Sequence, residues 1–400
     1  MSGSEIIALL KDHPARTPEA RIVRCMSERG AITAADLARA TGLARSTIST
    51  ALSELRSARI VIEVAQSMDV RGVGRPTSVF SLNPKAGTCI GLHVGLSSLR
   101  LIVADVSHAV LHHDEIELGL DYMPQAAIRK ARAAMSEAYR RGGLSPHSLL
   151  GIGVAVAGPV APDGRIQRAS MVPSWAGVNV RDVFASAFDT AVFADNESNC
   201  SALAEMIWGA AADIDDFVYL KIDVGLGGAI VVQRRVVTGA AGAGGEFGHI
   251  SIDPNGGLCR CGNHGCLELT AGFRTVLERM SHRRKKSVSI EDVVERAFGG
   301  DLDCVEAIAG IAEAAGRGLG IIGSILNPGI VVVGGAGAAA GPLLFDRLTD
   351  SYERHTLLKR AQLTEAQRLR IVPARFTTDG SLMGAVALVL RGLGALQGEG

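Results

Sequence analysis

Residues 244–269 read GGEFGHISIDPNGGLCRCGNHGCLEL, and they place one histidine and three cysteines at the spacing H-x9-C-x-C-x4-C. His249, Cys259, Cys261 and Cys266 offer one imidazole and three thiolates, the soft four-ligand set of a closed structural zinc site. The glycines interspersed among them allow the chain to wrap tightly around an ion. We predict a structural Zn²⁺ here, because four protein ligands leave no open position for a catalytic water.

The cysteine count supports this interpretation. The chain has 400 residues and seven cysteines, an odd number that fits a reducing compartment. Three of the cysteines fall within eight positions, which favours a metal site over a disulfide. The alternatives are a disulfide, which a reducing compartment disfavours, or three free thiols beside an unrelated histidine.

Two glutamates flank the metal-binding stretch. Glu246 lies three residues before His249, and Glu268 lies two residues after Cys266. A carboxylate only accepts hydrogen bonds, so two carboxylates held together by a metal loop match the paired hydroxyls of a sugar. We expect both to bind a sugar; the alternative is that they are ordinary surface charges.

Other stretches combine apolar strands with glycine-rich turns. Residues 88–106 read as two strands joined by a tight turn at 95–98, and residues 221–232 and 326–337 each contain an apolar strand and a glycine cluster. Residues 192–205 read as an apolar strand that ends in polar residues and runs into a helix. The glycine clusters are either phosphate-binding loops or plain structural turns.

Together these motifs resemble the ROK family of bacterial repressors and sugar kinases, over about residues 20–395. The resemblance implies an α/β fold of the actin-like ATPase type, a duplicated ribonuclease H-like domain whose two lobes enclose a sugar cleft. The first lobe is expected at residues 86–196, completed by a C-terminal helix at 377–400. The second lobe, with the zinc loop, is expected at residues 197–376.

The same resemblance implies roles for particular residues. Asn196 matches a sugar-hydroxyl ligand, and Glu197 occupies the general-base position, where the kinases keep a catalytic aspartate. Glu246, Glu268 and the metal ligand His249 match residues that contact the sugar.

The phosphate-binding side departs from the kinase pattern. The kinases place an aspartate, a glycine pair, threonine and lysine at the first hairpin, whereas this chain has His93 followed by GLSS at residues 95–98. An imidazole does not replace a carboxylate as a ligand of magnesium. Glu197 is one methylene longer than aspartate, a shift of about 1.5 Å to which proton transfer is sensitive. We therefore predict a sensor without catalytic residues; the alternative is an ATP-dependent, glucokinase-like ROK sugar kinase with an attached DNA-binding domain.

Residues 1–85 have the pattern of a winged helix-turn-helix DNA-binding domain. The predicted elements are helices at 18–29, 34–41 and 44–57 and strands at 60–65 and 78–82. Small hydroxyls and one arginine on the outer face of the third helix suit contacts with bases and phosphates: Arg45, Ser46, Thr47, Ser49 and Thr50. Arg71 and Arg75 lie between the two strands and are predicted to form the wing. The alternative is a module for protein contacts without DNA affinity.

Charge and hydropathy agree with a soluble DNA-binding regulator. The formal net charge is zero, but residues 1–85 hold 12 basic against 8 acidic residues, which is compatible with DNA binding by this segment. No stretch of about 18 uninterrupted apolar residues and no secretion signal is evident. We expect a cytoplasmic repressor of carbohydrate genes that binds operator DNA and a sugar or sugar phosphate, acts as a homodimer or dimer of dimers, and does not bind membranes.

Overall fold

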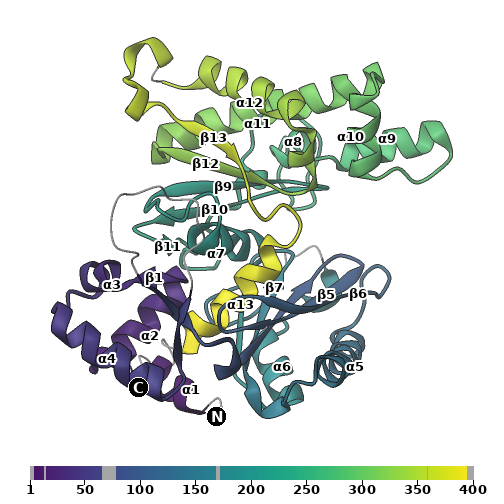
Figure 1. Cartoon of the computed structure of the whole chain (residues 1–400). Helices are drawn as coiled ribbons and strands as arrows, with labels where there is room; N and C mark the ends of the chain where they lie inside the picture. The colour runs from purple at the N-terminus through teal and green to yellow at the C-terminus, as the bar shows by residue number, and fades with distance from the viewer. Residues whose placement is uncertain (1–3, 13–14, 65–77, 168–171, 358, 394–400) are drawn as a thin grey trace. The chain divides into compact units, whose positions relative to one another are not determined.

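The computed structural model describes residues 4–12, 15–64, 78–167, 172–357 and 359–393 (Figure 1). The chain divides into two compact units, of which the first comprises Met1–Cys200 with Ser381–Gly400 and the second comprises Ser201–Gly380. Each unit is described by itself below.

The first unit begins with a small helical domain that carries a three-stranded sheet. Its helices are α1 (Ser4–Lys11), α2 (Pro18–Arg29), α3 (Ala34–Thr41) and α4 (Arg45–Ser57). The sheet has the order β1-β3-β2, formed by β1 (Ile32–Thr33), β3 (Val79–Leu82) and β2 (Val61–Val64), and both pairings are antiparallel. The predicted helices and strands are confirmed, whereas α1 and β1 were not predicted.

The turn between α3 and α4 forms as its sequence signals indicate. Thr33 caps α3 by accepting a hydrogen bond from the Asp36 N–H at 3.1 Å, and its hydroxyl donates to the Asp36 carboxylate at 2.6 Å. Gly42 ends α3 in the left-handed conformation with φ of 68°, which glycine adopts without strain. The chain therefore reverses tightly into α4.

The rest of the first unit is a five-stranded sheet of order β6-β5-β4-β7-β8. Its strands are β4 (Thr88–Val94), β5 (Ser98–Asp105), β6 (Val110–Glu117), β7 (Leu149–Val156) and β8 (Val192–Asn196). β4, β5 and β6 are antiparallel neighbours, while β4, β7 and β8 run parallel. The helices are α5 (Pro124–Gly142), α6 (Val180–Phe188) and the start of α7 (Glu197–Trp208).

Glycines on the central strands bring the C-terminal helix α13 (Gly380–Leu393) against this sheet. A Cβ atom at Gly153 would lie 1.8 Å from the Ala385 carbonyl oxygen, and one at Gly91 would lie 2.5 Å from that of Leu382. The backbones therefore approach too closely for any larger residue. Figure 1 shows α13, in yellow, lying over β7.

The second unit repeats the same sheet topology. Its sheet has the order β11-β10-β9-β12-β13, with β9 to β11 antiparallel and β12 parallel to both β9 and β13. The strands are β9 (Phe217–Ile222), β10 (Leu226–Val232), β11 (Arg235–Val236), β12 (Ile330–Gly334) and β13 (Arg370–Pro373). This duplication confirms the predicted α/β fold of ribonuclease H-like halves.

Helices of the second unit enclose a large apolar core. They are α8 (Glu268–Ala271), α9 (Arg274–Arg284), α10 (Ile290–Phe298), α11 (Leu302–Leu326) and α12 (Pro342–His355). Among the described residues, α11 is the one helix long and apolar enough to span a membrane, and 61% of its most apolar window is buried inside the protein. Its burial and its contacts with α12 fit a core helix of the second unit.

A buried carboxylate joins distant segments of the second unit. The Glu205 side chain is fully buried and accepts hydrogen bonds from the N–H groups of Ala210, Arg375 and Phe376 at 2.7, 3.1 and 2.8 Å. These bonds satisfy three backbone donors that would otherwise lose water without compensation.

Candidate functional site

Four predicted metal ligands meet in the second unit. The ligand atoms of His249, Cys259, Cys261 and Cys266 all lie within 4.8 Å of one another. The Sγ atoms of Cys261 and Cys266 are 3.6 Å apart, as are Cys259 Sγ and His249 Nδ1. Two thiolates on a tetrahedral zinc, with Zn–S bonds of about 2.3 Å, would lie about 3.8 Å apart. Both the geometry and the donor set therefore fit a closed zinc site.

The loop that carries these ligands is tied by backbone pairing and by one required glycine. Isolated bridges join Ser251 to Cys266 and Leu258 to His264. Gly265 has a φ of +61°, and a Cβ atom there would lie 1.6 Å from the carbonyl oxygen of Asp253. The loop can close around a metal only with glycine at this position.

The two predicted sugar-binding carboxylates lie beside the metal ligands. His249 directs Nδ1 toward Cys259, and its Nε2 lies 4.0 Å from Glu246 Oε2. Glu268 begins α8 and is buried, with its side chain 6% exposed. Arg260, which was not predicted to be a site residue, donates to both oxygens of Glu268 at 3.0 and 3.4 Å. Its position between the predicted metal ligands Cys259 and Cys261 is the sequence feature that could have identified it as a site residue.

The predicted sugar residues of the first unit have structural partners. Asn196 Oδ1 accepts hydrogen bonds from the N–H groups of Ser198 and Asn199 at 2.7 and 3.3 Å, so it caps α7. Its Nδ2 donates to the Gly158 carbonyl oxygen at 3.0 Å. Because Nδ2 carries two hydrogens, its second N–H could donate a hydrogen bond to a sugar hydroxyl.

Glu197 is paired with His93. Glu197 Oε2 lies 2.8 Å from His93 Nε2, and the two side chains are 17% and 14% exposed. This pair stands at the two positions where the resemblance places kinase carboxylates. Nearby, burial raises the pKa of Asp195, although hydrogen bonds from Asn199 and from the Asn196 N–H oppose the shift.

The glycine-rich turns of the second unit have packing roles. A Cβ atom at Gly228 would lie 2.1 Å from the Phe247 ring, and one at Gly334 would lie 2.1 Å from the Tyr219 hydroxyl. The Asp223 carboxylate joins the two turns by accepting hydrogen bonds from the N–H groups of Val224 and Ala336 at 2.8 and 3.2 Å. These contacts account for Gly228 and Gly334 by shape alone.

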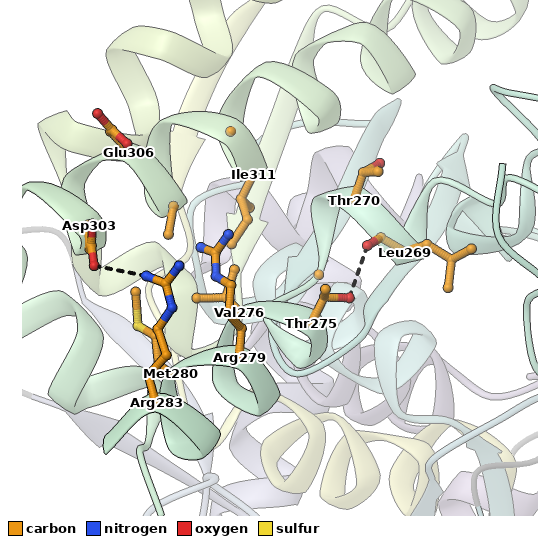
Figure 2. A pocket seen from close by; sticks show the side chains of 13 residues that line it. Leu269, Thr270, Thr275, Val276, Arg279, Met280, Arg283, Asp303, Glu306 and Ile311 are labelled. Carbon is orange, nitrogen blue, oxygen red and sulfur yellow. Dashed lines mark hydrogen bonds and ion pairs between the residues drawn. The ribbon is translucent and has the colours of Figure 1, made fainter. Parts of the chain in front are cut away.

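A cavity of about 560 Å³ lies in the second unit between α9 and α11 (Figure 2). Arg279 and Arg283 of α9 line one side, and Asp303 and Glu306 of α11 line the other, with Arg283 paired to Asp303 at 3.2 Å. None of the predicted sugar or metal residues lines it, although Leu269 directly follows Glu268. The cavity has balanced charge and is separate from the predicted sugar residues.

Helix α4 has one buried and one exposed face. Ile48, Ala51, Leu52 and Leu55 are buried against the rest of the helical domain. The predicted DNA-contacting residues fall on the outer face, where Arg45, Ser46, Ser49 and Thr50 are exposed and Thr47 is partly exposed. Arg71 and Arg75 lie outside the described residues.

Comparison with protein-family models gives two matches. A model described as ROK family matches residues 89–392, and a model described as winged helix-turn-helix DNA-binding matches residues 19–62. The ROK match covers most of the chain.

Known proteins and structures resemble the chain over nearly its full length. The xylose repressor of Bacillus subtilis is 26% identical, with 90% of this chain and 91% of that protein covered. The DNA-binding transcriptional repressor Mlc of Escherichia coli is 23% identical, with 94% and 93% covered. A crystal structure of a ROK family transcriptional regulator, described as a homolog of the E. coli Mlc protein, has a TM-score of 0.73 at 23% identity, with 98% of each chain covered. The last comparison shows a shared fold.

Proposed function

The chain belongs to the ROK family and has an N-terminal winged helix-turn-helix, and from this premise we propose that it is a sugar-responsive transcriptional repressor of carbohydrate genes. The full-length relatives described above carry repressor names, and the match includes both the DNA-binding segment and the ROK domain. The protein is a regulator rather than an enzyme.

The observation that carries this choice is the His93–Glu197 pair. A sugar kinase needs a carboxylate for magnesium and a base for the sugar hydroxyl. Here the first position holds an imidazole, and the carboxylate at the second position is bound to that imidazole at 2.8 Å. The first group is not a carboxylate that could bind magnesium, and the second is paired with an imidazole instead of a sugar hydroxyl. Both observations disfavour the alternative of a glucokinase-like enzyme.

A structural zinc ion is part of this proposal. His249, Cys259, Cys261 and Cys266 would hold it, and four protein ligands would close its coordination sphere. The ion would supply folding energy to the loop that carries Glu246, Arg260 and Glu268.

The proposed sugar ligands are Asn196, Glu197, Glu246, His249 and Glu268, and they come from both units. The proposed lobes are residues 86–196, with 377–400, and residues 197–376, and the sugar would favour one of two conformations of the protein. The ligand can shift this equilibrium only by its different affinities for the two conformations.

The proposed DNA interface consists of the exposed face of α4 and the arginines 71 and 75. The domain at residues 1–85 would act as one half of a homodimer, or of a dimer of dimers, because palindromic operators require two recognition helices at matched spacing. We propose that the protein works in the cytoplasm, without membrane contact.

A thermal-shift screen of the zinc-loaded protein tests the proposal. Free and phosphorylated sugars are added with and without ATP and magnesium, since a ligand that binds the folded state raises its stability. We expect a sugar to raise the melting temperature while ATP and magnesium add nothing. Stabilisation by ATP and magnesium together with sugar-dependent ADP release would establish the kinase instead.

A further inference from the structure

Arg260 is held in place by its neighbours in the chain. It lies between Cys259 and Cys261, two of the four clustered metal ligands, so its backbone belongs to the metal loop. Its Nε and Nη2 atoms donate to the two oxygens of Glu268 at 3.0 and 3.4 Å. A two-point contact between guanidinium and carboxylate fixes the orientation of both groups.

Glu268 has little acceptor capacity left for a sugar. A carboxylate offers about four lone-pair sites. Three N–H groups already point to Glu268, two from Arg260 and one from the Leu226 backbone at 3.4 Å. On another side the backbone of Gly225 lies close to the carboxylate, because a Cβ atom there would lie 2.7 Å from Glu268 Oε2. A ligand hydroxyl could therefore claim about one site on this carboxylate.

The guanidinium group of Arg260, in contrast, has more N–H donors than its contact with Glu268 uses. It carries five N–H groups, and in the part of the chain that the structure describes its hydrogen bonds go only to Glu268. The Arg260 side chain is 34% exposed, compared with 6% for Glu268. The group that a ligand meets first beside Glu268 is therefore a cationic donor.

We propose that Arg260 contacts the effector and selects sugars that carry an anionic group, a carboxylate or a phosphate; this inference rests on the proposed function and names the class of ligand. Glu246 and the second nitrogen of His249 remain suited to hydroxyls, while Arg260 offers N–H donors to anionic oxygens. The pairing with Arg260 also offsets the charge of Glu268, which would otherwise repel an anion. A sugar with both hydroxyl groups and an anionic group can bind to Glu246 and His249 through the former and to Arg260 through the latter.

The test compares binding of matched sugars to the full, zinc-loaded chain by calorimetry. Each set contains a neutral hexose, its uronic acid and its 6-phosphate, with glucose, galactose and mannose as parent sugars. We expect one charged member to bind more tightly than its neutral parent by about 10-fold or more, the size of a charge-assisted hydrogen bond. The uronate and phosphate arms distinguish the two sources of charge.

Arg260→Gln should remove the preference for the charged member, and Arg260→Lys should retain part of it. The matched control is Arg279→Gln in the separate cavity, and zinc content is measured for every variant so that loss of the metal loop is recognised. A purely structural role would change the affinity for charged and neutral members together. The proposal is overturned if every neutral hexose binds as tightly as its charged partners, or if Arg260→Gln leaves the ratio unchanged. If no sugar of any set binds, the proposed function itself fails.

Discussion

His93 Nε2 on β4 and Glu197 Oε2 at the start of α7 lie 2.8 Å apart. Both side chains are mostly buried, with 14% and 17% exposed, so the contact is shielded from solvent. Where a carboxylate is shielded from solvent, its hydrogen bond is strong, so the partner of the carboxylate determines which reactions the carboxylate can take part in. In the proposed function, this pair takes the place of the magnesium ligand and the base that a sugar kinase needs.

Replacing His93 with aspartate should expose this relationship. His93→Asp brings a second carboxylate toward Glu197, and we expect the free energy of unfolding at pH 7 to fall by about 1–3 kcal/mol from like-charge repulsion and the lost hydrogen bond. Urea titration measures the change. The double variant with Glu197→Gln should recover part of the loss, because only one charge is left. Equal losses in the single and double variants would contradict the interpretation.

The metal loop should tolerate alanine at one glycine and reject it at another. Gly262 and Gly265 both have positive φ, but an added Cβ has no neighbour within 4 Å at Gly262 and meets the Asp253 carbonyl oxygen at Gly265. We expect Gly262→Ala to cost about 1 kcal/mol from backbone strain and Gly265→Ala to cost more than about 2 kcal/mol and to lose zinc. The zinc content per chain after dialysis and the midpoint of urea unfolding measure these two effects. Similar zinc retention in the two variants would contradict the described geometry of the loop.

The exposed face of α4 should determine affinity for DNA. Arg45→Ala should weaken binding to the upstream DNA of the protein's own gene about 10-fold or more, since such contacts contribute about 1–3 kcal/mol. Gel-shift titration at fixed salt provides the measurement. Arg165→Ala is the control, because Arg165 is exposed in the first unit outside the helix-turn-helix. If both variants bind like the parent protein, α4 is not the recognition helix.

Stability should fall in mild acid through His108. Burial lowers the pKa of His108 from 6.5 to about 3, so the unfolded chain takes up a proton before the folded one as the pH falls. His108 therefore leaves the free energy of unfolding unchanged above pH 6.5. Between pH 6.5 and pH 3 it lowers the free energy of unfolding by about 1.4 kcal/mol per pH unit.

Comparing the parent chain with His108→Asn measures this contribution. His108 has φ of 73°, a conformation that asparagine tolerates, and asparagine does not titrate. Urea unfolding between pH 7 and pH 5 should show a steeper loss in the parent chain than in the variant. Parallel curves would show that His108 does not titrate as its burial requires.

Local signals made much of the fold predictable from the sequence. Thr33 and Gly42 mark the ends of α3 through bonds within a few residues, and the histidine and cysteine spacing at 249–266 predicts a cluster that the structure does bring together. The turn between β4 and β5 at residues 95–98 was predictable for the same reason, since glycine turns and apolar runs are local features.

Contacts between distant segments were not predictable in this way. Glu205 binds N–H groups 170 and 171 residues away, and His93 meets Glu197 across 104 residues. No spacing rule joins such positions, because the fold must form before they become neighbours. Helix α1 was also missed, although its apolar residues Ile6 and Leu10 are buried.

We propose that a sugar controls DNA binding by this protein and is not phosphorylated by it. Fluorescence anisotropy of labelled upstream DNA, titrated with the zinc-loaded chain in the presence of each sugar and sugar phosphate, tests it most directly. We predict that one class of ligand changes the DNA affinity by about 10-fold or more, within the range of coupling between linked sites, and that adding ATP and magnesium leaves this change unaltered. A DNA affinity that no sugar changes, accompanied by sugar-dependent ADP release, would show instead that the protein is a sugar kinase.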